Sequence, residues 1–480
     1  MHFDVLIVGA GLSGVGAACH LQRECPGRTY AILEGRDAMG GTWDLFRYPG
    51  VRSDSDMYTL GYRFRPWRDP RAIADGASIL AYIRETAVER GVDRHIRYGH
   101  RVVRADWSTP DARWTVTAES GGQPVTLTCG FLYTCTGYYA YEAGYTPEFA
   151  QRERFRGPVV HPQHWPADLD LVGKRVVVIG SGATAVTLVP ALAEQAAHVT
   201  MLQRSPTYIS AQPSRDAVAD AFRKVLPDRV AYAASRWKNV LRSTFYYDLS
   251  RRWPALVARA LRKEAQAALG PDYDVATHFT PRYAPWDERM CLAPDGDFFA
   301  AIRSGRASVV TDRIDCFTET GIRLASGAHL DADVIVTATG LNMRLMSGLQ
   351  LVVDGAPVDL SKTVAYKGAM YSDVPNLASA LGYTNASWTL KCDLTAEYVC
   401  RLLNLMQRDG YVQATPRLGA GAVGQDAVVD LKSGYVRRAL ATLPRQGARA
   451  PWRLHQSYVR DLALLRFGRV RDPELELRRG

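Results

Sequence analysis

Two short glycine-rich strings could hold phosphate groups: GAGLSG at residues 9–14 and GSGATA at residues 180–185. Each string follows an apolar run and opens a segment in which apolar residues recur with helical spacing. In that context a tight turn exposes backbone N–H groups at a helix N-terminus to a pyrophosphate. An ordinary strand–turn–helix corner is the alternative, but two such strings in one chain favour two nucleotide sites. The candidate contacts are Gly9, Gly11, Ser13 and Gly14 in the first string, and Gly180, Ser181, Gly182, Ala183, Thr184 and Ala185 in the second.

The residues after each string distinguish the two nucleotides. Glu34 lies 20 residues after Gly14, at the end of an apolar stretch, where a carboxylate can accept hydrogen bonds from ribose hydroxyls. This arrangement suits FAD or NAD. Arg204 lies 19 residues after the second string, in place of a carboxylate. A guanidinium pairs with a 2′-phosphate that a carboxylate would repel, so the second site favours NADPH, with Ser205 and Thr207 as further donors. A solvated arginine at a strand end is the alternative.

The elements that must position these residues form two similar units. The first runs from a strand and glycine loop to Glu34 and closes at an apolar strand ending in Thr-Gly at residues 136–137. The second begins at Lys174, is interrupted by a helical stretch, and closes in the same way at residues 339–340. This repetition predicts an α/β fold with two dinucleotide-binding (Rossmann-like) domains and a helical insert. We expect an FAD-binding domain from residues 1–145 and 344–480, an NADPH-binding domain from residues 146–212 and 280–343, and the insert at residues 213–279.

Composition restricts the class of protein. With 480 residues the chain can bury a large core and divide into two or three domains. Its eight cysteines are scattered, without a C-x-x-C pair or a histidine at metal-ligand spacing, which favours reduced thiols in a cytoplasmic protein. The N-terminus enters a strand directly, so no export signal is expected. Glycine and proline interrupt the nearly uncharged run at residues 176–193, which favours a buried strand and helix over a membrane span.

The net charge of +10 raises the question of anionic partners. Basic residues are spread along the chain without an aromatic-interleaved RNA motif, so nucleic acid is not expected as a partner. Much of the excess lies at residues 223–263, where basic and apolar residues alternate in a helical pattern. Two interpretations stay open: the segment packs its apolar face on its own domain, or it makes a peripheral membrane contact. No pattern in the sequence indicates an oligomeric state.

A third string, FRGPVVHPQHWP at residues 155–166, connects the two units. Its spacing, F-x-G-x-x-x-H-x-x-x-W-P, resembles the fingerprint of the Baeyer–Villiger monooxygenases, flavoproteins related to the flavin-containing monooxygenases. Further matches extend over nearly the whole chain, and the pattern is most similar to the ethionamide-activating branch of actinobacterial monooxygenases. These matches are GGTW at residues 40–43, RYPG at 47–50, RSD at 52–54, QRSPT at 203–207, ATG at 338–340 and YTNASW at 383–388.

The resemblance implies roles for individual residues. The positions that match FAD-binding residues are Gly9, Gly11, Ser13, Gly14, Glu34, Gly41, Thr42, Trp43 and Asp54, with the backbone of Val102 at the adenine. His161 matches a linker histidine that couples cofactor binding to domain placement. Arg289 matches the active-site arginine, and Asp54 matches the carboxylate that positions it. Several family members carry a lysine before that arginine to hold the NADPH phosphate; Glu288 stands there instead, which leaves more of this task to Arg204.

The resemblance also implies an enzyme that uses FAD, NADPH and O₂. In this family, flavin reduced by NADPH traps O₂ as a C4a-peroxide, which inserts one oxygen into a ketone to give an ester or lactone, or oxygenates sulfur. A fixed cation beside the peroxide, Arg289 here, favours the ketone reaction. The alternatives are a flavin-containing S- or N-oxygenase without Baeyer–Villiger activity, and a non-catalytic FAD-binding protein at a membrane surface. A disulfide reductase is disfavoured because no redox-active cysteine pair follows the first string.

Overall fold

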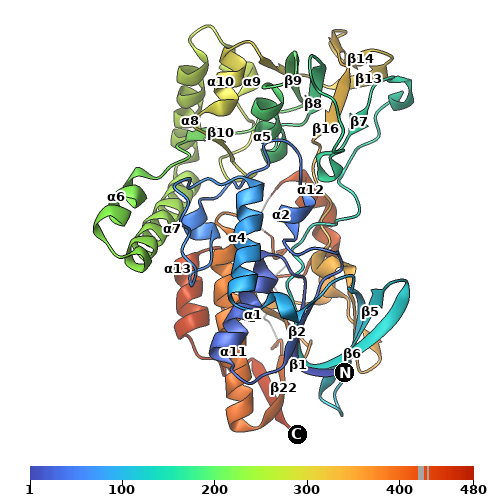
Figure 1. Ribbon diagram of the computed structural model, residues 1–480, viewed down its shortest axis with the longest axis vertical. Coiled ribbons are helices and arrows are strands. Elements are labelled where there is room, and N and C mark those ends of the chain that lie inside the picture. The colour runs from blue at the N-terminus through green and yellow to red at the C-terminus, as the bar shows by residue number, and fades with distance from the viewer. Residues whose placement is uncertain (420–425, 430–431) are drawn as a thin grey trace.

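The computed structural model describes residues 1–419, 426–429 and 432–480, and it contains two sheet-based parts stacked along the long axis (Figure 1). The part that holds the N-terminus and the C-terminus contains a nine-stranded sheet, and the other contains a five-stranded parallel sheet. In each part, a strand of the sheet is followed by one of the glycine strings and then by a helix, which is the start of a Rossmann-like unit. The predicted α/β class with two such units is therefore confirmed.

The first sheet has a parallel half and an antiparallel half. The second half of β6 pairs in parallel with β1, and its first half pairs antiparallel with β5, so one long strand joins the two halves. In spatial order the strands are β18 (Ala356–Pro357), β17 (Gln350–Val353), β4 (Arg101–Ser108), β5 (Arg113–Ser120), β6 (Gln123–Thr134), β1 (His2–Val8), β2 (Tyr30–Leu33) and β3 (Ile96–Arg97), with β21 (Leu377–Ser379) also beside β6. The chain thus returns to this sheet after crossing the second one.

Helices and short hairpins complete this part. Its helices are α1 (Leu12–Glu24), α2 (Thr42–Leu45), α3 (Met57–Leu60), α4 (Gly76–Glu89), α11 (Trp388–Asp409), α12 (Gly434–Ala439) and α13 (Tyr458–Asp461). The strand pairs are β19 (Ala365–Tyr366) with β20 (Met370–Tyr371), and β22 (Tyr411–Pro416) with β23 (Leu475–Arg479). Helix α11 is the longest of these helices and packs along α1, so the C-terminal region covers the first glycine loop and its helix.

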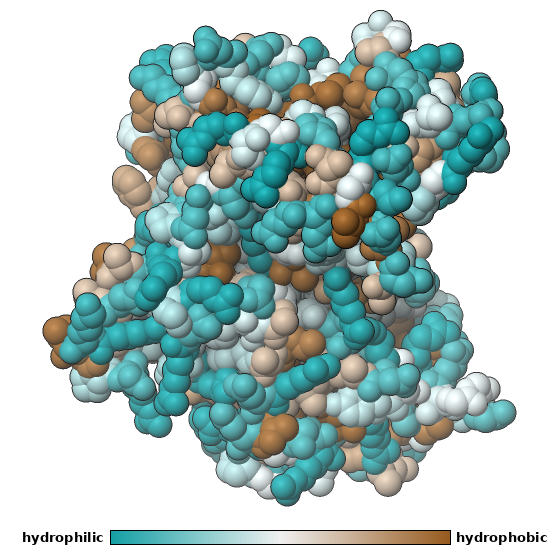
Figure 2. Space-filling model, turned by 45° about the horizontal axis from the view of Figure 1, so that its top comes forward, coloured by the Kyte–Doolittle hydropathy of each residue, from teal (hydrophilic) through white to brown (hydrophobic). Residues whose placement is uncertain are grey.

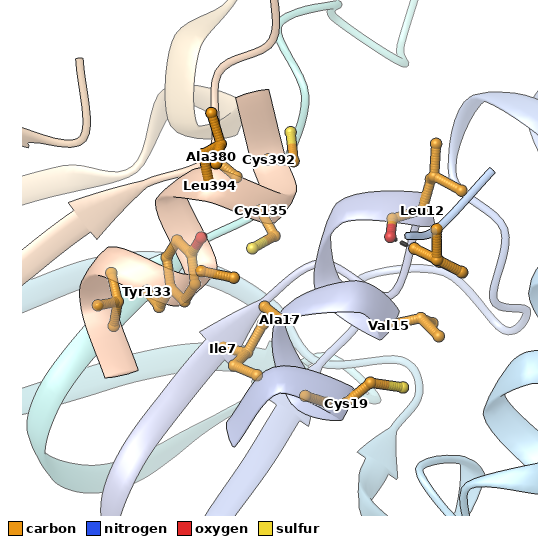
Figure 3. Close-up of a cluster of buried hydrophobic side chains, with 14 of the residues drawn as sticks. Ile7, Leu12, Val15, Ala17, Cys19, Tyr133, Cys135, Ala380, Cys392 and Leu394 are labelled. Atoms are coloured by element: carbon orange, nitrogen blue, oxygen red, sulfur yellow. Dashed lines mark hydrogen bonds between the residues drawn. The ribbon is translucent and has the colours of Figure 1, made fainter. Parts of the chain in front are cut away.

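The core of the first part is shared by segments far apart in the sequence. Figure 3 shows Ile7 of β1 beside Ala17 of α1, with Tyr133 of β6 and Leu394 of α11 in the same cluster. All four side chains are almost completely buried. All eight cysteines are free and buried, Cys392 among them. The contacts explain why α1 cannot move without disturbing the sheet and α11 together.

The second sheet has the strand order β12-β9-β8-β16-β7. Its elements are β7 (Val159–Val160), β8 (Arg175–Ile179), α5 (Ala183–Leu192), β9 (His198–Gln203), α10 (Asp297–Arg303), β12 (Ala307–Thr311) and β16 (Val334–Thr337). A parallel pair, β10 (Ile209–Gln212) with β11 (Cys291–Pro294), and a meander of β13 (Ile314–Thr318), β14 (Gly321–Leu324) and β15 (His329–Asp331) flank it. The run at residues 176–193 forms β8 and α5, as predicted.

The chain between β10 and β11 forms the helical insert. It contains α6 (Ala217–Val225), α7 (Asp228–Arg252), α8 (Pro254–Leu269) and α9 (Val275–His278). Helix α7 packs on α3 of the first part, and α8 packs on α10 and β10 of the second, so the insert connects both parts. Among helices of the described ranges, none has the length and apolar character required to cross a bilayer.

The packing of the insert differs from its amphipathic interpretation. The interpretation that the apolar residues of this segment pack on their own domain fails for five of them, which are exposed: Trp237, Leu241, Phe245, Trp253 and Leu256. The buried face of α7 contains Tyr232, Arg236 and Asn239, because polar groups there hydrogen-bond to backbone carbonyls and carboxylates of the first part. On the face seen in Figure 2 hydrophilic residues dominate and hydrophobic residues lie scattered among them.

Candidate functional site

The first glycine loop packs too tightly for side chains. A Cβ added to Gly14 would lie 1.9 Å from the carbonyl oxygen of Gly9, so only glycine permits this approach of α1 to the loop. Gly11 is the N-cap of α1, and in the described structure no side chain caps it. The first-turn N–H groups are therefore available to an anion, as a pyrophosphate requires. Ser13 lies buried in the same turn.

Glu34 stands at the end of β2 beside this loop. Its carboxylate accepts hydrogen bonds from the backbone N–H of Ala10 at 2.7 Å and of Arg36 at 3.0 Å. A carboxylate offers about four acceptor positions, so two stay available for ribose hydroxyls. Burial raises the pKa of Glu34. The N–H of His100 donates to the backbone oxygen of Glu34, which brings the start of β4 and Val102 next to this position.

A second glycine turn faces the first. A Cβ on Gly41 would lie 3.2 Å from the Cα of Gly11, so the two loops leave a narrow space between backbones. Thr42 and Trp43 continue from this turn into α2. The phenol of Tyr141 hydrogen-bonds to Thr42. Sequence reasoning missed Tyr141, because it follows the Thr-Gly closure in a segment without a motif.

The second glycine loop has the same architecture. Gly180 has φ +129°, and a Cβ there would lie 2.3 Å from the carbonyl oxygen of Ala338 at the end of β16. The hydroxyl of Ser181 donates to the carbonyl oxygen of Ser205 at 3.0 Å, which joins this loop to the end of β9. Gly182 caps α5 without a side-chain bond, within the described chain, as Gly11 caps α1. Ala183, Thr184 and Ala185 form the first turn of α5.

Arg204 is exposed at the end of β9, where a 2′-phosphate could reach it. Glu288 lies near it: burial raises the pKa of Glu288, and the positive charges of Arg437 and Arg204 oppose that rise. The lysine position of the family is thus occupied here by a half-buried carboxyl group between two arginines. Sequence reasoning missed Arg437, because it comes from α12, almost 150 residues after Glu288.

Arg289 and Asp54 form a two-point ion pair. Nη2 of Arg289 lies 2.9 Å from one carboxylate oxygen of Asp54, and Nε lies 2.6 Å from the other. Burial opposes the charge of the guanidinium, but the negative charge of Asp54 raises the pKa of Arg289 above its ordinary value. The arginine is therefore a permanent cation. The structure brings together two residues that are 235 positions apart in the sequence.

This ion pair lines a cavity of about 520 Å³ whose walls come from both sheet-based parts and the insert. Much of the wall surface is apolar, and charged side chains such as Asp56, Asp216 and Lys238 line it together with the ion pair. A cavity of this size and character fits a small organic molecule held by a few polar contacts.

Three tyrosines lie close enough to Arg289 to interact with its charge: Tyr138, Tyr139 and Tyr435. The hydroxyl of Tyr138 lies 3.0 Å from that of Tyr139, and burial raises the pKa of both. Tyr435 is close enough to interact with the charge of Arg289, and burial raises its pKa as well. These phenols stay protonated at neutral pH. They were not predicted, because no sequence spacing relates them to Arg289.

The known proteins that are similar to this chain are consistent with nucleotide binding at the two glycine loops. The flavin-binding monooxygenase-like family matches residues 68–252, and the NAD(P)-binding Rossmann-like domain matches residues 7–69. The chain is 56% identical over 475 residues to the FAD-containing monooxygenase EthA of Mycobacterium tuberculosis (strain ATCC 25618 / H37Rv), covering 99% of this chain and 97% of that protein. The chain belongs to the FAD-containing monooxygenases. This membership confirms the predicted family, enzyme class and flavin cofactor.

Other proteins similar to this FAD-containing monooxygenase support the same family and the same fold. EthA of Mycolicibacterium smegmatis is 54% identical, with 99% of this chain and 96% of that protein covered. Among solved structures, an oxidized steroid monooxygenase bound to NADP matches with a TM-score of 0.78 at 24% identity over 100% of both chains. An open cyclohexanone monooxygenase matches with a TM-score of 0.75 at 19% identity over 99% of both chains. These two structures support the arrangement of two dinucleotide-binding units.

In this FAD-containing monooxygenase, His161 connects the linker to the second unit. Its Nδ1 accepts from the N–H of Gln163 at 3.1 Å, so Nε2 carries the proton and donates to the carbonyl oxygen of Gly340 at 3.1 Å. Gly144 lies against the ring, where a Cβ would approach to 1.9 Å. Burial lowers the pKa of His161 below its ordinary value. Both ring nitrogens are occupied, which suits a positioning role and leaves neither free to act as a base.

The linker histidine should make stability depend on pH. Because the folded state lowers the pKa of His161, its contribution is complete above about pH 6.5 and is lost as the pH falls below that value. We expect His161→Gln to remove about 1 kcal/mol of stability at pH 7.5, the contribution of one hydrogen bond. The variant should lose less than the wild type on acidification to pH 5.5. Urea denaturation of the two FAD-loaded proteins at both pH values measures this; equal pH dependence would contradict it.

Two further contacts of the FAD-containing monooxygenase join its units. Tyr48, in the loop after α2, is buried in the core of the second part and hydrogen-bonds to Thr184 in the second glycine loop. Arg52 pairs with Asp297 of α10. The RYPG and RSD strings indicated that this loop matters, but not that it reaches the other unit. The loop that carries Asp54 is thus anchored on both sides.

Proposed function

We propose that the protein is an FAD- and NADPH-dependent monooxygenase that inserts one oxygen of O₂ into ketones, giving esters or lactones. The observation that carries the proposal is the Arg289–Asp54 ion pair on the wall of a cavity formed by both units. The overall reaction converts ketone, O₂, NADPH and a proton into ester, water and NADP⁺. Oxygenation of thioethers or thioamides is the second activity that the same machinery supports.

The residues present fit both nucleotides. The uncapped start of α1, the facing turn at Gly41 and the free acceptor positions of Glu34 suit FAD, which supplies oxygen activation after reduction by NADPH. The uncapped start of α5 and the exposed Arg204 suit NADPH. On the same grounds we propose the domain boundaries and the roles of the site residues that the sequence predicts. One of these roles is a contact of the Val102 backbone with the adenine.

The chain's own contribution to the reaction is electrostatic. As oxygen adds to a ketone carbon, negative charge develops on the carbonyl oxygen, and a preorganised cation stabilises it. Arg289 supplies that cation; it donates a hydrogen bond from Nη2 to one oxygen of Asp54 and pairs through Nε with the other, and these two contacts hold its orientation.

Isotope incorporation tests the proposal. The FAD-loaded protein is incubated with NADPH and ¹⁸O₂ and a panel of linear, cyclic and aryl ketones, and separately with thioanisole. We expect ester or lactone that carries one ¹⁸O atom per NADPH consumed. Sulfoxide without any ester would support an S-oxygenase instead, and NADPH oxidation that yields only hydrogen peroxide would refute oxygenation. An absence of NADPH oxidation would favour a non-catalytic flavoprotein.

Coenzyme preference should depend on Arg204. Replacing it with glutamate removes a charge-assisted contact to the 2′-phosphate, which contributes about 1.5–3 kcal/mol. We expect Arg204→Glu to lower the ratio of kcat/KM for NADPH to that for NADH by about 10- to 100-fold. The exposed Arg303 of α10 provides a control with the same change of charge. An unchanged ratio in Arg204→Glu, or an equal change in Arg303→Glu, would refute the assignment.

A further inference from the structure

A second cavity lies between the first part and the helical insert and shares no lining residue with the cavity at Arg289. It has a volume of about 830 Å³ and is bounded by α1, the end of α4, the buried face of α7 and the C-terminal segment. Six arginines line it, against a single carboxylate, Glu89. The arginines are Arg23, Arg63, Arg90, Arg229, Arg236 and Arg466. Nothing in the proposed reaction uses this cavity.

Carboxylates behind the wall do not neutralise these arginines. Arg63 and Arg466 share one partner, Glu397. Arg236 shares Asp393 with His20. Burial lowers the pKa of His20, but its hydrogen bond to Asp393 acts against this effect and the net result is a raised pKa, so His20 also favours its charged form. Each acid therefore serves two cationic groups. The wall keeps an excess of positive charge.

Two of the lining arginines have no carboxylate within ion-pair distance in the described part of the chain: Arg90 and Arg229. Glu89, the one acidic lining residue, pairs instead with Arg65, outside the cavity. In a concave site the field of like charges adds up and attracts an anion. The charge distribution therefore selects a negatively charged ligand.

Among the described arginines of this wall, Arg236 is the one that is almost completely buried. It is 4% exposed, and its Nη1 donates to the carbonyl oxygens of Tyr58 at 2.8 Å and Gly61 at 2.7 Å. Its Nε–H is buried and, among the residues that the structure describes, has no acceptor. A buried donor without a partner costs about 1–3 kcal/mol.

The remaining wall is aromatic and aliphatic. Phe64, Tyr232, Trp237, Val240 and Tyr458 line the cavity beside the arginines. A purely ionic ligand would leave this surface unused, whereas an alkyl chain or ring would bury it. The volume lies within the range of sites for small organic molecules.

We propose that this cavity is a binding site for an organic anion, with a phosphate or carboxylate head at the arginines and an apolar body against the aromatic wall. The site is separate from the monooxygenase reaction, so it does not rest on the function proposed above. The same region contains His20, Glu24 and Glu397 within ligand distance of one another, but arginines already pair with these acids. A metal cation is therefore disfavoured there.

Calorimetry with the FAD-loaded protein tests the site. The protein is titrated separately with octyl phosphate, octanoate, octanol and inorganic phosphate. Saturating NADP⁺ is present throughout, so that the coenzyme site is occupied. We expect at least one of the two octyl anions to bind, at least tenfold more tightly than octanol or inorganic phosphate. The comparison of octyl phosphate with octanoate identifies the preferred head group. Binding should weaken as salt is raised, because charge attraction is screened.

A pair of double variants locates the binding. Arg90→Glu/Arg229→Glu reverses two lining charges that make no ion pair in the described structure, and Arg259→Glu/Arg303→Glu makes the same change of net charge on exposed residues outside the cavity. We expect the first to weaken octyl anion binding at least tenfold and the second to leave it unchanged, with monooxygenase turnover retained in both. Absence of binding, equal effects of the two variants, or equal affinity for octanol would overturn the proposal.

Discussion

Replacing Arg289 with alanine should reduce kcat for ketone oxygenation by about 10²- to 10³-fold, the loss found when one charge-stabilising group is removed from such a site. The cation lies on the wall of the proposed substrate cavity, and no other cation is paired with Asp54 within the described ranges. FAD should stay bound, because the first glycine loop and Glu34 do not contact Arg289. Flavin absorbance and ester formation, measured on the same preparation, separate the two effects.

Three control variants separate the loss of the Arg289 charge from the effect of leaving Asp54 unpaired. Arg289→Lys keeps the charge but loses the two-point contact with Asp54, so partial activity is expected. Arg282→Ala removes an exposed arginine seven residues earlier and should have no effect. In Arg289→Ala/Asp54→Asn the orphaned carboxylate is also removed; if activity returns there, the loss came from the unpaired Asp54 and not from the missing cation. Full turnover in Arg289→Ala would refute its role.

Gly14→Ala should yield a protein that loses most of its FAD. The added methyl group would lie 1.9 Å from the carbonyl oxygen of Gly9, so α1 must move away from the loop that we propose holds the pyrophosphate. Helix α1 is packed against α11 and cannot move freely, so the strain should also cost about 1–3 kcal/mol of folding stability. The flavin-to-protein ratio after purification and urea denaturation measure the two effects.

The second glycine loop provides a matched comparison. It carries alanine at the corresponding position, Ala185, which is fully buried, and a Cβ on Gly182 would meet nothing within 4 Å. Gly182→Ala should therefore leave both FAD content and stability almost unchanged. If Gly14→Ala retains full flavin, the close approach at Gly9 does not limit cofactor binding. If Gly182→Ala is as damaging as Gly14→Ala, the effect is not the steric one.

Local patterns predicted the repeated units well. Buried β-branched runs followed by glycine strings gave β1 with α1 and β8 with α5, because strand burial and the close turn are encoded by adjacent residues. The helical insert followed from its periodicity in the same way. Its packing did not: apolar residues such as Phe245 are exposed, whereas Arg236 is buried. Periodicity identifies a helix but does not specify the surface on which its faces lie.

The sequence by itself predicted two nucleotide-binding loops, an acidic and a basic residue to distinguish them, and, through its resemblance to a family, roles for Arg289 and Asp54. Only the tertiary structure decided how they combine. The ion pair of Arg289 with Asp54 and the arginine-lined cavity join residues that are 200 or more positions apart, such as Arg23 and Arg466. Sequence spacing carries information over a few turns of helix or strand, whereas such contacts depend on how whole elements pack.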